Sequence, residues 1–431
     1  MMAIPAALSA KYKDSFAYKT VKDRMPVIVA KVADSVFRAQ STIKESHGEK
    51  GSEDLKTIAG CVSKLRNEMM TNKVLIPIED SRSDTKTWNA YLTEVTTQEG
   101  QAPAWFTSPW LYVECYMYRR IQEAVEKCSC LTQYDVFRAE KEMALSGSQE
   151  AVHTLVKFLF SLVKEIEGGK ESNTRELFDQ FMQVCLWGNK CDLSISAGME
   201  NAQVSCPLAQ VDTLREYVLI NDLDLVWNQL QKTGPVRVDI ILDNAGFEII
   251  TDLCLAEFLL TAKLASSIHF HCKAFSWFVS DVTKDDFDHT LSFLMSSNSM
   301  AMDFVCKRWK EHLQNSTWKI HTHDFWTLPF PYCEMEKRSN DLYMELAQSG
   351  LLIFKGDLNY RKLVADINWP ASTPFVTSLQ GFGPGPLVSL RALKADVVTG
   401  LREGQADEMQ TRDSQWMING NWAVMSFADK H

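Results

Sequence analysis

Beyond about residue 235, short apolar runs alternate with longer segments whose apolar residues recur at helical spacing. Runs of this length, bounded by turn residues, indicate buried β-strands. Strands that alternate with helices favour a mostly parallel sheet covered by helices on both faces, which predicts the α/β fold class. The predicted strands are residues 236–242, 267–273, 351–356, 387–393 and 421–427.

The first 190 residues have a different pattern, that of amphipathic helices. Apolar residues lie three or four apart in "SPWLYVECYMYRRIQEAVEKC", and a glycine pair at 168–169 suits the end of another helix. A chain of 431 residues is too long for one ordinary core, so about two domains are expected. We predict a helical N-terminal region over residues 1–190 and an α/β domain over residues 191–431.

The composition excludes several classes of protein. The chain has 45 Lys and Arg against 55 Asp and Glu, and this acidic balance argues against partners such as nucleic acid or an anionic membrane. It has no run of 18 apolar residues and no apolar segment typical of a signal peptide, so we expect neither a membrane span nor secretion. The 11 scattered cysteines are typical of reduced thiols. We therefore expect a cytoplasmic location, with the nucleus as a second one.

Polar side chains follow three of the predicted strands at the point where each strand ends. Asp243 and Asn244 come after the first strand, Asp281 after the second, and the segment "DLNYR" at 357–361 after the third. In open α/β sheets, ligands bind beyond the carboxyl ends of the strands. These three segments are therefore predicted to line one crevice.

The residue types in this crevice are suited to a metal ion and a phosphate group. Two carboxylates and an amide oxygen, from Asp243, Asp281 and Asn244, are the hard ligands that Mg²⁺ or Mn²⁺ prefers. Arg361 and Lys394, which follows the next predicted strand, would neutralise a bound phosphate. Structural alternatives remain open, because Asp243-Asn244 and Asp281 are also good turn and helix-capping residues and "DLNYR" reads as a solvated loop.

Two other groups of residues are weaker candidates for sites. His269 and His271 are two apart, so on a strand they share a face, but no second ligand pair with metal spacing accompanies them. The same holds for His321 and His323. The glycine-rich stretch "GFGPGPLVSL" is interrupted by prolines and precedes a predicted strand, which favours a turn over a nucleotide loop.

Five segments in order give the chain a family resemblance. They are "SFAYKTVKDRMPVI", "LWGNKCDLSIS", "ILDNAGFEIITDLCLAEFLL", "WFVSDVTKDDF" and "FKGDLNYRKL". Together they resemble the metal-dependent damage-control phosphatases, in the subfamily also described as acidic-residue (protein-glutamate) methyltransferases. The resemblance runs from about residue 10 to near the end of the chain.

The resemblance implies a fold, a metal and a class of substrate. The implied fold is a helical region on an α/β/α sandwich, and the implied metal is manganese, cobalt or nickel, with magnesium as a further candidate. The implied substrates are small sugar phosphates, notably fructose 1-phosphate and fructose 6-phosphate. The alternative activity implies S-adenosylmethionine as a cofactor and a protein as the substrate.

The resemblance also assigns roles to individual residues. The metal ligands match Asp243, Asn244 and Asp281. Glu248 and Asp281 match residues linked to S-adenosylmethionine, and Asp192 is a further candidate near the site. One departure is Ala392, which stands in "RALK" where the family has threonine, serine or cysteine. The residues matching the substrate contacts are Asp243, Asn244, Asp357, Leu358, Asn359, Tyr360, Arg361 and Lys394.

These observations together predict a metal-dependent phosphatase acting on small phosphorylated metabolites. Either water or the Asp243 carboxylate would attack phosphorus. The first alternative is an S-adenosylmethionine-dependent protein-glutamate methyltransferase, against which the lack of a convincing glycine-rich cofactor loop counts. The second alternative is a non-catalytic interaction protein, against which the intact Asp243, Asn244 and Asp281 set counts.

Overall fold

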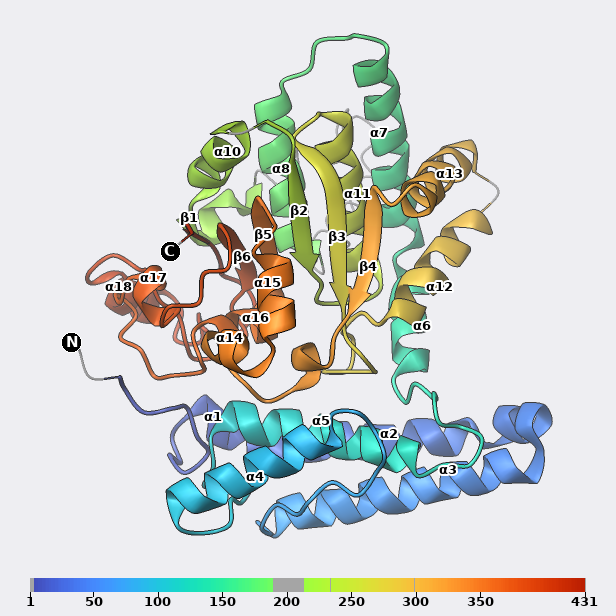
Figure 1. Ribbon diagram of the computed structural model, residues 1–431, viewed down its shortest axis with the longest axis vertical. Helices are drawn as coiled ribbons and strands as arrows, with labels where there is room; N and C mark the ends of the chain where they lie inside the picture. Colours follow the sequence, from blue (N-terminus) through green and yellow to red (C-terminus); the bar gives the residue numbers. More distant parts are fainter. Residues whose placement is uncertain (1–3, 189–212, 233, 298, 431) are drawn as a thin grey trace.

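A seven-stranded sheet forms the centre of the computed structural model, which describes residues 4–188, 213–232, 234–297 and 299–430 (Figure 1). The strands lie in the order β1-β7-β6-β5-β2-β3-β4, and all neighbours run parallel except β6 and β7, which pair antiparallel. Their bounds are β1 (Val218–Asn221), β2 (Val236–Ile241), β3 (Ala265–Cys272), β4 (Trp318–Thr322), β5 (Leu351–Lys355), β6 (Leu387–Ala392) and β7 (Ala423–Ala428).

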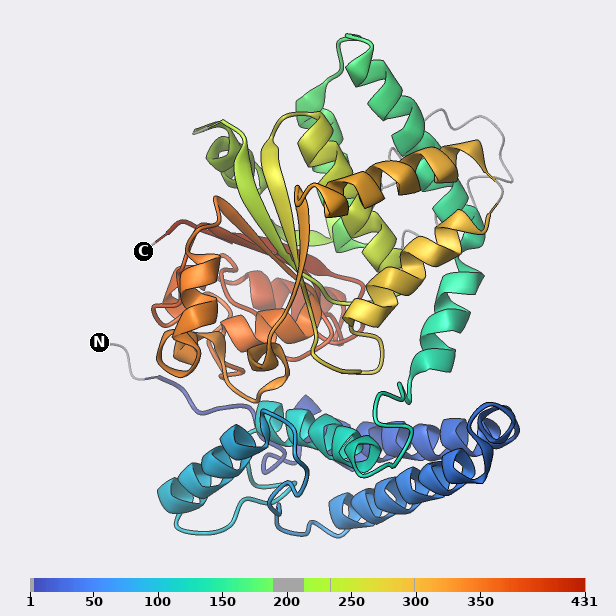
Figure 2. The same cartoon turned by 45° about the vertical axis from the view of Figure 1, so that its right-hand side comes forward.

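Helices from the first 126 residues form a layer across one end of the sheet, the end toward which β2 and β3 point (Figure 1). Figure 2 shows the same layer beneath the sheet from a second direction. Its elements are α1 (Phe16–Lys19), the π-helical turn η1 (Thr20–Arg24), α2 (Met25–Arg38), α3 (Gln40–Met70), α4 (Thr85–Glu99) and α5 (Trp110–Glu126). We call this group of elements the helical layer.

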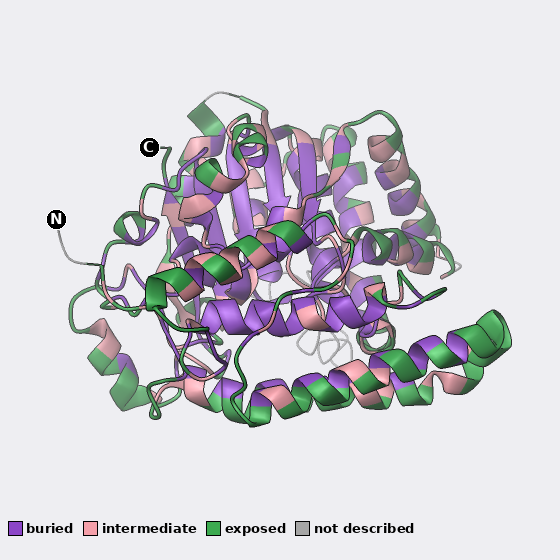
Figure 3. Ribbon diagram, turned by 60° about the horizontal axis from the view of Figure 1, so that its bottom comes forward, coloured by how far each residue is buried: buried purple, intermediate pink, exposed green. Residues whose placement is uncertain are grey.

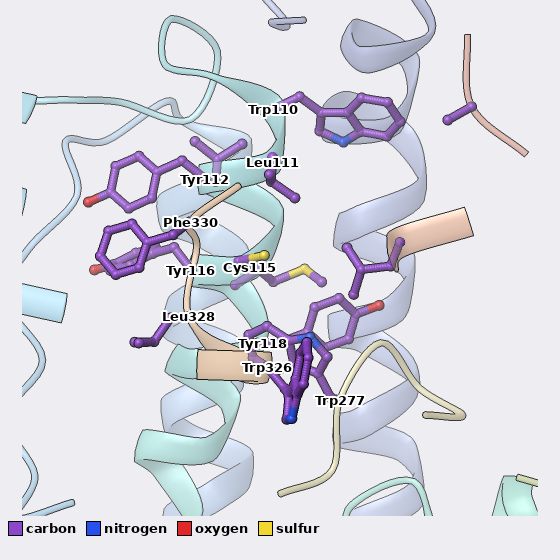
Figure 4. Packing of buried hydrophobic residues seen from close by; sticks show 14 of the residues in the cluster. Trp110, Leu111, Tyr112, Cys115, Tyr116, Tyr118, Trp277, Trp326, Leu328 and Phe330 are labelled. Carbon is purple, nitrogen blue, oxygen red and sulfur yellow. The ribbon is translucent and has the colours of Figure 1, made fainter. Parts of the chain in front are cut away.

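Helix α5 is the buried element of the helical layer, and its ribbon is almost wholly purple in Figure 3. A helix that is apolar or aromatic on most of its sides must be covered on most of its sides. Its aromatic residues, among them Tyr112 and Tyr118, pack beside Trp277, Trp326 and Phe330, which follow β3 and β4 in the chain (Figure 4). This packing fixes the helical layer against the end of the sheet.

The two faces of the sheet are covered by two different sets of elements, and α6 (Arg138–Gly147) leads from the helical layer to the first set. The first set is α7 (Gln149–Glu167), α8 (Thr174–Leu186), α10 (Leu223–Lys232), α11 (Phe247–Thr261), α12 (Lys284–Met295) and α13 (Met300–Gln314). The second set is η3 (Asp324–Thr327), η4 (Tyr332–Glu334), α14 (Met335–Arg338), α15 (Asn340–Leu346), α16 (Gly356–Leu363), α17 (Phe375–Ser378) and α18 (Gln405–Arg412).

Alternation along the strands supplies apolar side chains to both faces. In β5, Leu351 and Ile353 belong to the hydrophobic cluster under the first set of helices, whereas Leu352 and Phe354 belong to the cluster on the opposite face. Successive side chains of a strand point to opposite faces, so a strand covered on both sides must be apolar throughout. This requirement explains why β5 was recognisable as a short apolar run.

The predicted fold class is confirmed, because a mostly parallel sheet lies between layers of helices and follows a helical N-terminal region. All five predicted strands form, within two residues at each end. Strands β1 and β4, at the two edges, were not predicted, since their short sequences carry polar residues on exposed positions. None of the helices among the described residues is long and apolar enough to cross a membrane.

The predicted division after residue 190 stays a prediction about domains. Helices α7 and α8 precede that position, and both pack against α11 on one face of the sheet. The helical layer ends with α5, at residue 126, so the packing changes well before the predicted boundary.

Candidate functional site

A cavity of about 320 Å³ lies between the carboxyl ends of the central strands and the helical layer. Segments that follow β2, β3, β5 and β6 line it from the sheet side, and residues of η1 and α5 line it from the helical layer. We call this cavity the carboxylate pocket, because five acidic side chains line it: Glu114, Asp243, Glu248, Asp281 and Asp357.

Asp243, Asn244 and Asp281 meet at the bottom of the carboxylate pocket. The segments after β2 and β3 pair through a bridge between Asn244 and Asp281, with Val282 donating its N–H to the Asp243 carbonyl at 2.8 Å. The Asn244 amide donates to Asp243 Oδ2 at 2.6 Å, and its Oδ1 accepts from Ser280 Oγ. Sheet pairing thus brings together three side chains that lie up to 38 positions apart in the sequence.

Of the two aspartates of this group, Asp281 is buried and Asp243 is half-buried, and other carboxylates lie near both. Burial and the nearby carboxylates of Glu248 and Asp281 raise the pKa of Asp243 well above its usual value. Burial also raises the pKa of Asp281, although Lys273 Nζ lies 3.1 Å from its Oδ2 and opposes the rise. Among the described residues, Asp243 has no such direct cation partner.

Gly356 gives Asp243 the space that it occupies. This glycine begins α16 with a φ of +84°, which L side chains rarely adopt, and a Cβ atom placed on it would lie 1.9 Å from Asp243 Oδ2. Any other residue would therefore displace the carboxylate. The close approach also places Asp243 beside the first turn of α16.

Glu248 lies in the pocket wall but is committed to two partners. Its Oε2 accepts from the Asn244 amide at 2.8 Å, and its Oε1 accepts from Lys355 Nζ at 3.1 Å. Lys355 is fully buried and also donates to Asp252 Oδ1 at 2.7 Å. Glu248 therefore orients Asn244 from the first turn of α11.

Three residues of the predicted 357–361 segment line the carboxylate pocket: Asp357, Leu358 and Arg361. The other two, Asn359 and Tyr360, are not among the lining residues. Asn359 instead accepts from the Tyr332 hydroxyl and donates to the Lys355 carbonyl at 2.7 Å. The segment is a helix, so residues three or four apart share a face, and Asn359 and Tyr360 lie on a face other than that of Asp357 and Arg361.

Arg361 is held by carboxylates of the protein itself. Its Nε and Nη2 donate to the two oxygens of Asp366, at 2.8 and 3.0 Å, and its Nη1 donates to Glu114 at 2.6 Å. The guanidinium carbon lies 3.6 Å from the centre of the Trp110 ring. Arg361 thus joins α16 to α5, and little of its guanidinium remains for a ligand.

Lys394 and Asp357 also line the carboxylate pocket. Asp357 accepts from Arg391 Nε at 2.8 Å and from the Lys394 backbone N–H at 3.2 Å. Burial opposes ionisation of Asp357, but Arg391 and Arg361 hold the pKa of its carboxyl below the usual value. The Lys394 side chain is exposed, and no ion pair or side-chain hydrogen bond engages it within the described part of the chain. Ala392 also lines the pocket.

Sequence reasoning missed the contribution of the helical layer, namely Arg24, Trp110 and Glu114. Arg24 ends the π-helical turn η1, and such turns are frequent at functional sites. It is exposed, and no described residue forms an ion pair or a side-chain hydrogen bond with it. The segment "SFAYKTVKDRMPVI" signalled the importance of this region, but only packing shows that Arg24 reaches the pocket. Asp192 lies outside the described residues.

The carboxylate pocket has the chemistry of a site for a divalent cation. Asp243, Asn244 and Asp281 offer hard oxygen donors, and Asp243, whose pKa is raised by burial and by nearby carboxylates, has no ion-pair partner among the described residues. These donors are not the tightest acidic or histidine group, since only His269, His321 and Glu345 bring three such ligand atoms within 4.8 Å among the described residues. A cation at the pocket would leave room for further ligands such as phosphate oxygens.

Comparison with known proteins identifies the family. Residues 20–409 match the damage-control phosphatase ARMT1-like domain. The chain belongs to this family. The family predicted from the sequence segments is thereby confirmed.

Relatives of the ARMT1-like family match over nearly their full lengths. The chain is 45% identical over 434 residues to a protein named Damage-control phosphatase ARMT1 from Xenopus tropicalis, covering 98% of this chain and 99% of the relative. Proteins of the same name from Danio rerio and Homo sapiens are 44% and 41% identical, over 100% and 99% of this chain and 98% and 99% of theirs. A crystal structure of a DUF89 family protein from Pyrococcus horikoshii, 12% identical, superimposes with a TM-score of 0.41, covering 86% of this chain and 96% of that one.

Proposed function

We propose that this ARMT1-like protein is a metal-dependent phosphatase acting on small phosphorylated metabolites. The observation that carries the proposal is the charge arrangement in the carboxylate pocket. Asp243, which has no ion-pair partner among the described residues, lines the same pocket as two cationic side chains, Arg24 and Lys394, that no described residue engages. A phosphate group with a divalent cation would satisfy both sets of charges at once.

Asp243, Asn244 and Asp281 would hold the divalent cation. When bound, the cation would polarise a phosphoryl oxygen and offset the negative charge that otherwise repels phosphate. Manganese, cobalt and nickel are the proposed metals, as the family resemblance implies, with magnesium as a further candidate; carboxylate and amide oxygens best suit manganese and magnesium. Lys273 and Glu248 would hold Asp281 and Asn244 in place through the contacts described above.

Arg24 and Lys394 are the proposed phosphate-binding residues. Arg24 approaches from the helical layer and Lys394 from the segment after β6, so a phosphate between them would be neutralised from two sides. Arg361 would act as a positioning residue, because its guanidinium ties Glu114 and Asp366 together. Asp357 is placed to accept hydrogen bonds from substrate hydroxyl groups.

Fructose 1-phosphate and fructose 6-phosphate are the proposed substrates. A cavity of about 320 Å³ is at the small end of the range of about 300–1,000 Å³ for small-molecule sites, which suits a phosphorylated sugar. We propose water as the group that attacks phosphorus, with Trp110, Trp187 and Phe278 restricting the access of bulk solvent. If Asp243 attacked instead, rapid acid quenching would trap a phosphorylated aspartate.

The methyltransferase alternative receives no support from the geometry. Glu248, whose counterpart is linked to S-adenosylmethionine by the resemblance, uses both carboxylate oxygens to bind Asn244 and Lys355. A cofactor contact at this residue would have to break a buried ion pair.

A phosphate-release assay tests the proposal. Metal-stripped protein is incubated with fructose 1-phosphate or fructose 6-phosphate, first in excess chelator and then with manganese, cobalt, nickel or magnesium added. We expect no release in chelator and recovery with at least one metal. Asp281→Asn should stay inactive, whereas Asp288→Asn, which changes an exposed carboxylate on α12, should match the wild type. Full activity on metal-stripped protein, or no release with any metal, would overturn the assignment. Labelled methyl transfer is measured in parallel.

A further inference from the structure

A second group of potential metal ligands lies on the sheet itself, away from the carboxylate pocket. In β3, Ile268, Phe270 and Cys272 belong to the hydrophobic cluster on one face, so His269 and His271 point to the other face. On the neighbouring strand β4, His321 is the register partner of His271. The polar face of β3 and β4 therefore presents three imidazoles in neighbouring positions.

The imidazoles are stacked and close together. The rings of His269 and His321 have centroids 4.9 Å apart, and His269 Nδ1 lies 3.1 Å from His321 Nε2. Glu345, on α15, completes the group, with Oε1 4.0 Å from His269 Nδ1. We call His269, His321 and Glu345 the histidine cluster. Their ligand atoms all lie within 4.8 Å of one another.

We propose that the histidine cluster is a second metal site, which takes a borderline divalent cation of the zinc type. Two imidazole nitrogens bound to tetrahedral zinc at about 2.0–2.1 Å are separated by about 3.3 Å, close to the observed spacing of His269 and His321. With Glu345 as the third protein ligand, a tetrahedral cation keeps one position for water, and the Glu345 side chain is 37% exposed. The nitrogen donors separate this site from the oxygen-only pocket, which suits harder cations.

The protonation state of the histidines favours cation binding. Burial lowers the pKa of His269 to about 4. Burial, followed by the neighbouring His271, also lowers the pKa of His321. Both imidazoles are therefore neutral at neutral pH, and a neutral imidazole can offer a nitrogen lone pair to a metal.

Neighbouring side chains support and compete with the proposed site. His271 Nε2 lies 2.8 Å from Asp239 Oδ1, which keeps that imidazole out of the ligand set. Arg237 Nη1 lies 2.9 Å from Glu345 Oε1, so the cation must share this carboxylate with a guanidinium. We therefore expect weaker binding than in a site made of thiolates.

The site would join three elements that are far apart in the sequence. His269 and His321 lie on β3 and the edge strand β4, and Glu345 lies on α15 of the covering layer. A bound cation would link the edge of the sheet to that layer. Its effect should be on stability, independent of catalysis at the carboxylate pocket.

Metal content and spectroscopy of the full-length protein test the proposal. Metal-stripped protein is titrated with zinc, and bound metal is measured after removal of the excess. We expect His321→Gln and His269→Gln each to bind one equivalent less than the wild type. They should also lose the rise in melting temperature that zinc gives to the wild type. His153→Gln, which changes an exposed histidine on α7, is the matched control and should keep both properties.

Cobalt substitution identifies the ligands. Cobalt bound by two imidazoles and a carboxylate at low coordination absorbs more strongly in the visible range than cobalt in an octahedral oxygen site, and it lacks thiolate charge-transfer bands. The spectrum should vanish in His321→Gln and persist in Asp281→Asn. Equal zinc content and equal spectra in His321→Gln and the wild type would overturn the proposal, as would charge-transfer bands assigning the metal to cysteines. If Asp281→Asn loses metal while both histidine variants keep the full amount, the bound metal lies in the carboxylate pocket and the proposed second site is wrong.

Discussion

Two groups of carboxylates in this protein differ in whether a cation is bound to them. One is the Arg119 cluster, formed by Arg119, Asp80 and Asp84, and the other lines the carboxylate pocket. Arg119, in α5, donates to both oxygens of Asp80 and to both oxygens of Asp84, at 2.6–2.9 Å. All three side chains are buried. In the carboxylate pocket, half-buried Asp243 has neighbouring carboxylates but no direct cation partner among the described residues.

We infer from this difference that the Arg119 cluster stabilises the fold, whereas the carboxylates of the pocket bind a ligand. Burial opposes ionisation of Asp80, but hydrogen bonds and charge from Arg119 lower the pKa of its carboxyl below the usual value. The pKa of Asp243 is instead raised. A buried cluster in which two carboxylates share a cation is costly to break, because removing the cation leaves uncompensated charge. We expect a carboxylate without a cation partner to destabilise the ligand-free protein and to be stabilised by cation binding, as at many functional sites.

The largest expected effect is that of Asp243→Asn. Without this carboxylate, metal-dependent phosphate release should fall by at least about a hundredfold, because charge stabilisation at the reacting group is lost. The metal-free variant should melt at or above the metal-free wild type, since a repulsive charge is removed. Metal at about 100 times its dissociation constant should stabilise the wild type by about 2.7 kcal/mol and the variant by much less.

Asp243→Asn is a cleaner test of stability than Asp281→Asn, because the latter also takes the ion-pair partner from buried Lys273. The measurements are phosphate release and thermal melts with and without manganese. A clear loss of stability in metal-free Asp243→Asn would show that Asp243 has a structural role and would remove the contrast with the Arg119 cluster.

Arg119→Met should have the opposite effect. It leaves Asp80 and Asp84 buried without their shared cation, so the free energy of unfolding should fall by about 3–5 kcal/mol. Phosphate release per folded molecule and its metal dependence should stay near the wild type, because the cluster does not line the pocket. Urea unfolding and active-fraction measurements test this. A stable variant with weakened metal binding would contradict the proposed division of roles.

Arg24→Gln should have an intermediate effect, confined to substrate binding. Loss of one charged hydrogen bond costs about 1.5–3 kcal/mol, so kcat/KM for sugar phosphates should fall at least about tenfold. Stability should not change, because Arg24 is exposed and has no ion-pair partner among the described residues. Lys22→Gln, an exposed change in the same π-helical turn, is the control. Unchanged kinetics for Arg24→Gln would place Arg24 outside the phosphate site.

Ala392→Thr should have the smallest effect. Ala392 lines the pocket at the position where the family resemblance expects a small polar group. A hydroxyl there would add at most one neutral hydrogen bond to the substrate, worth about 0.5–1.5 kcal/mol. We expect KM for fructose phosphates to fall by a few fold with kcat unchanged. A rise in KM would mean that the larger side chain hinders the substrate, and that alanine at position 392 serves to leave room for it.

Much of the sheet could be predicted from the sequence, because burial on both faces demands apolar side chains at most successive positions, as at 240–242 and 351–354. The edge strand β4 was not predicted, because it has only five residues, too few for the alternation between core-facing Trp318 and the polar face of His321 to stand out. The same alternation hid the histidine cluster. His269 was visible as a candidate, but its nearest nitrogen partner lies 52 residues away and its carboxylate partner on a separate helix.

The sequence by itself determined which residue types stand at the ends of the strands, since a strand followed by Asp243 and Asn244 delivers oxygen donors to the edge of a parallel sheet. Tertiary structure decided which of the charged side chains pair with other residues of the protein and which remain available to a ligand. Arg361 and Arg24 are both arginines, yet Asp366 and Glu114 occupy most of the first, whereas the second is free of described partners. The reason is that Coulomb interactions and desolvation depend on distances of a few ångströms between side chains, and those distances are set only when the helical layer packs against the sheet.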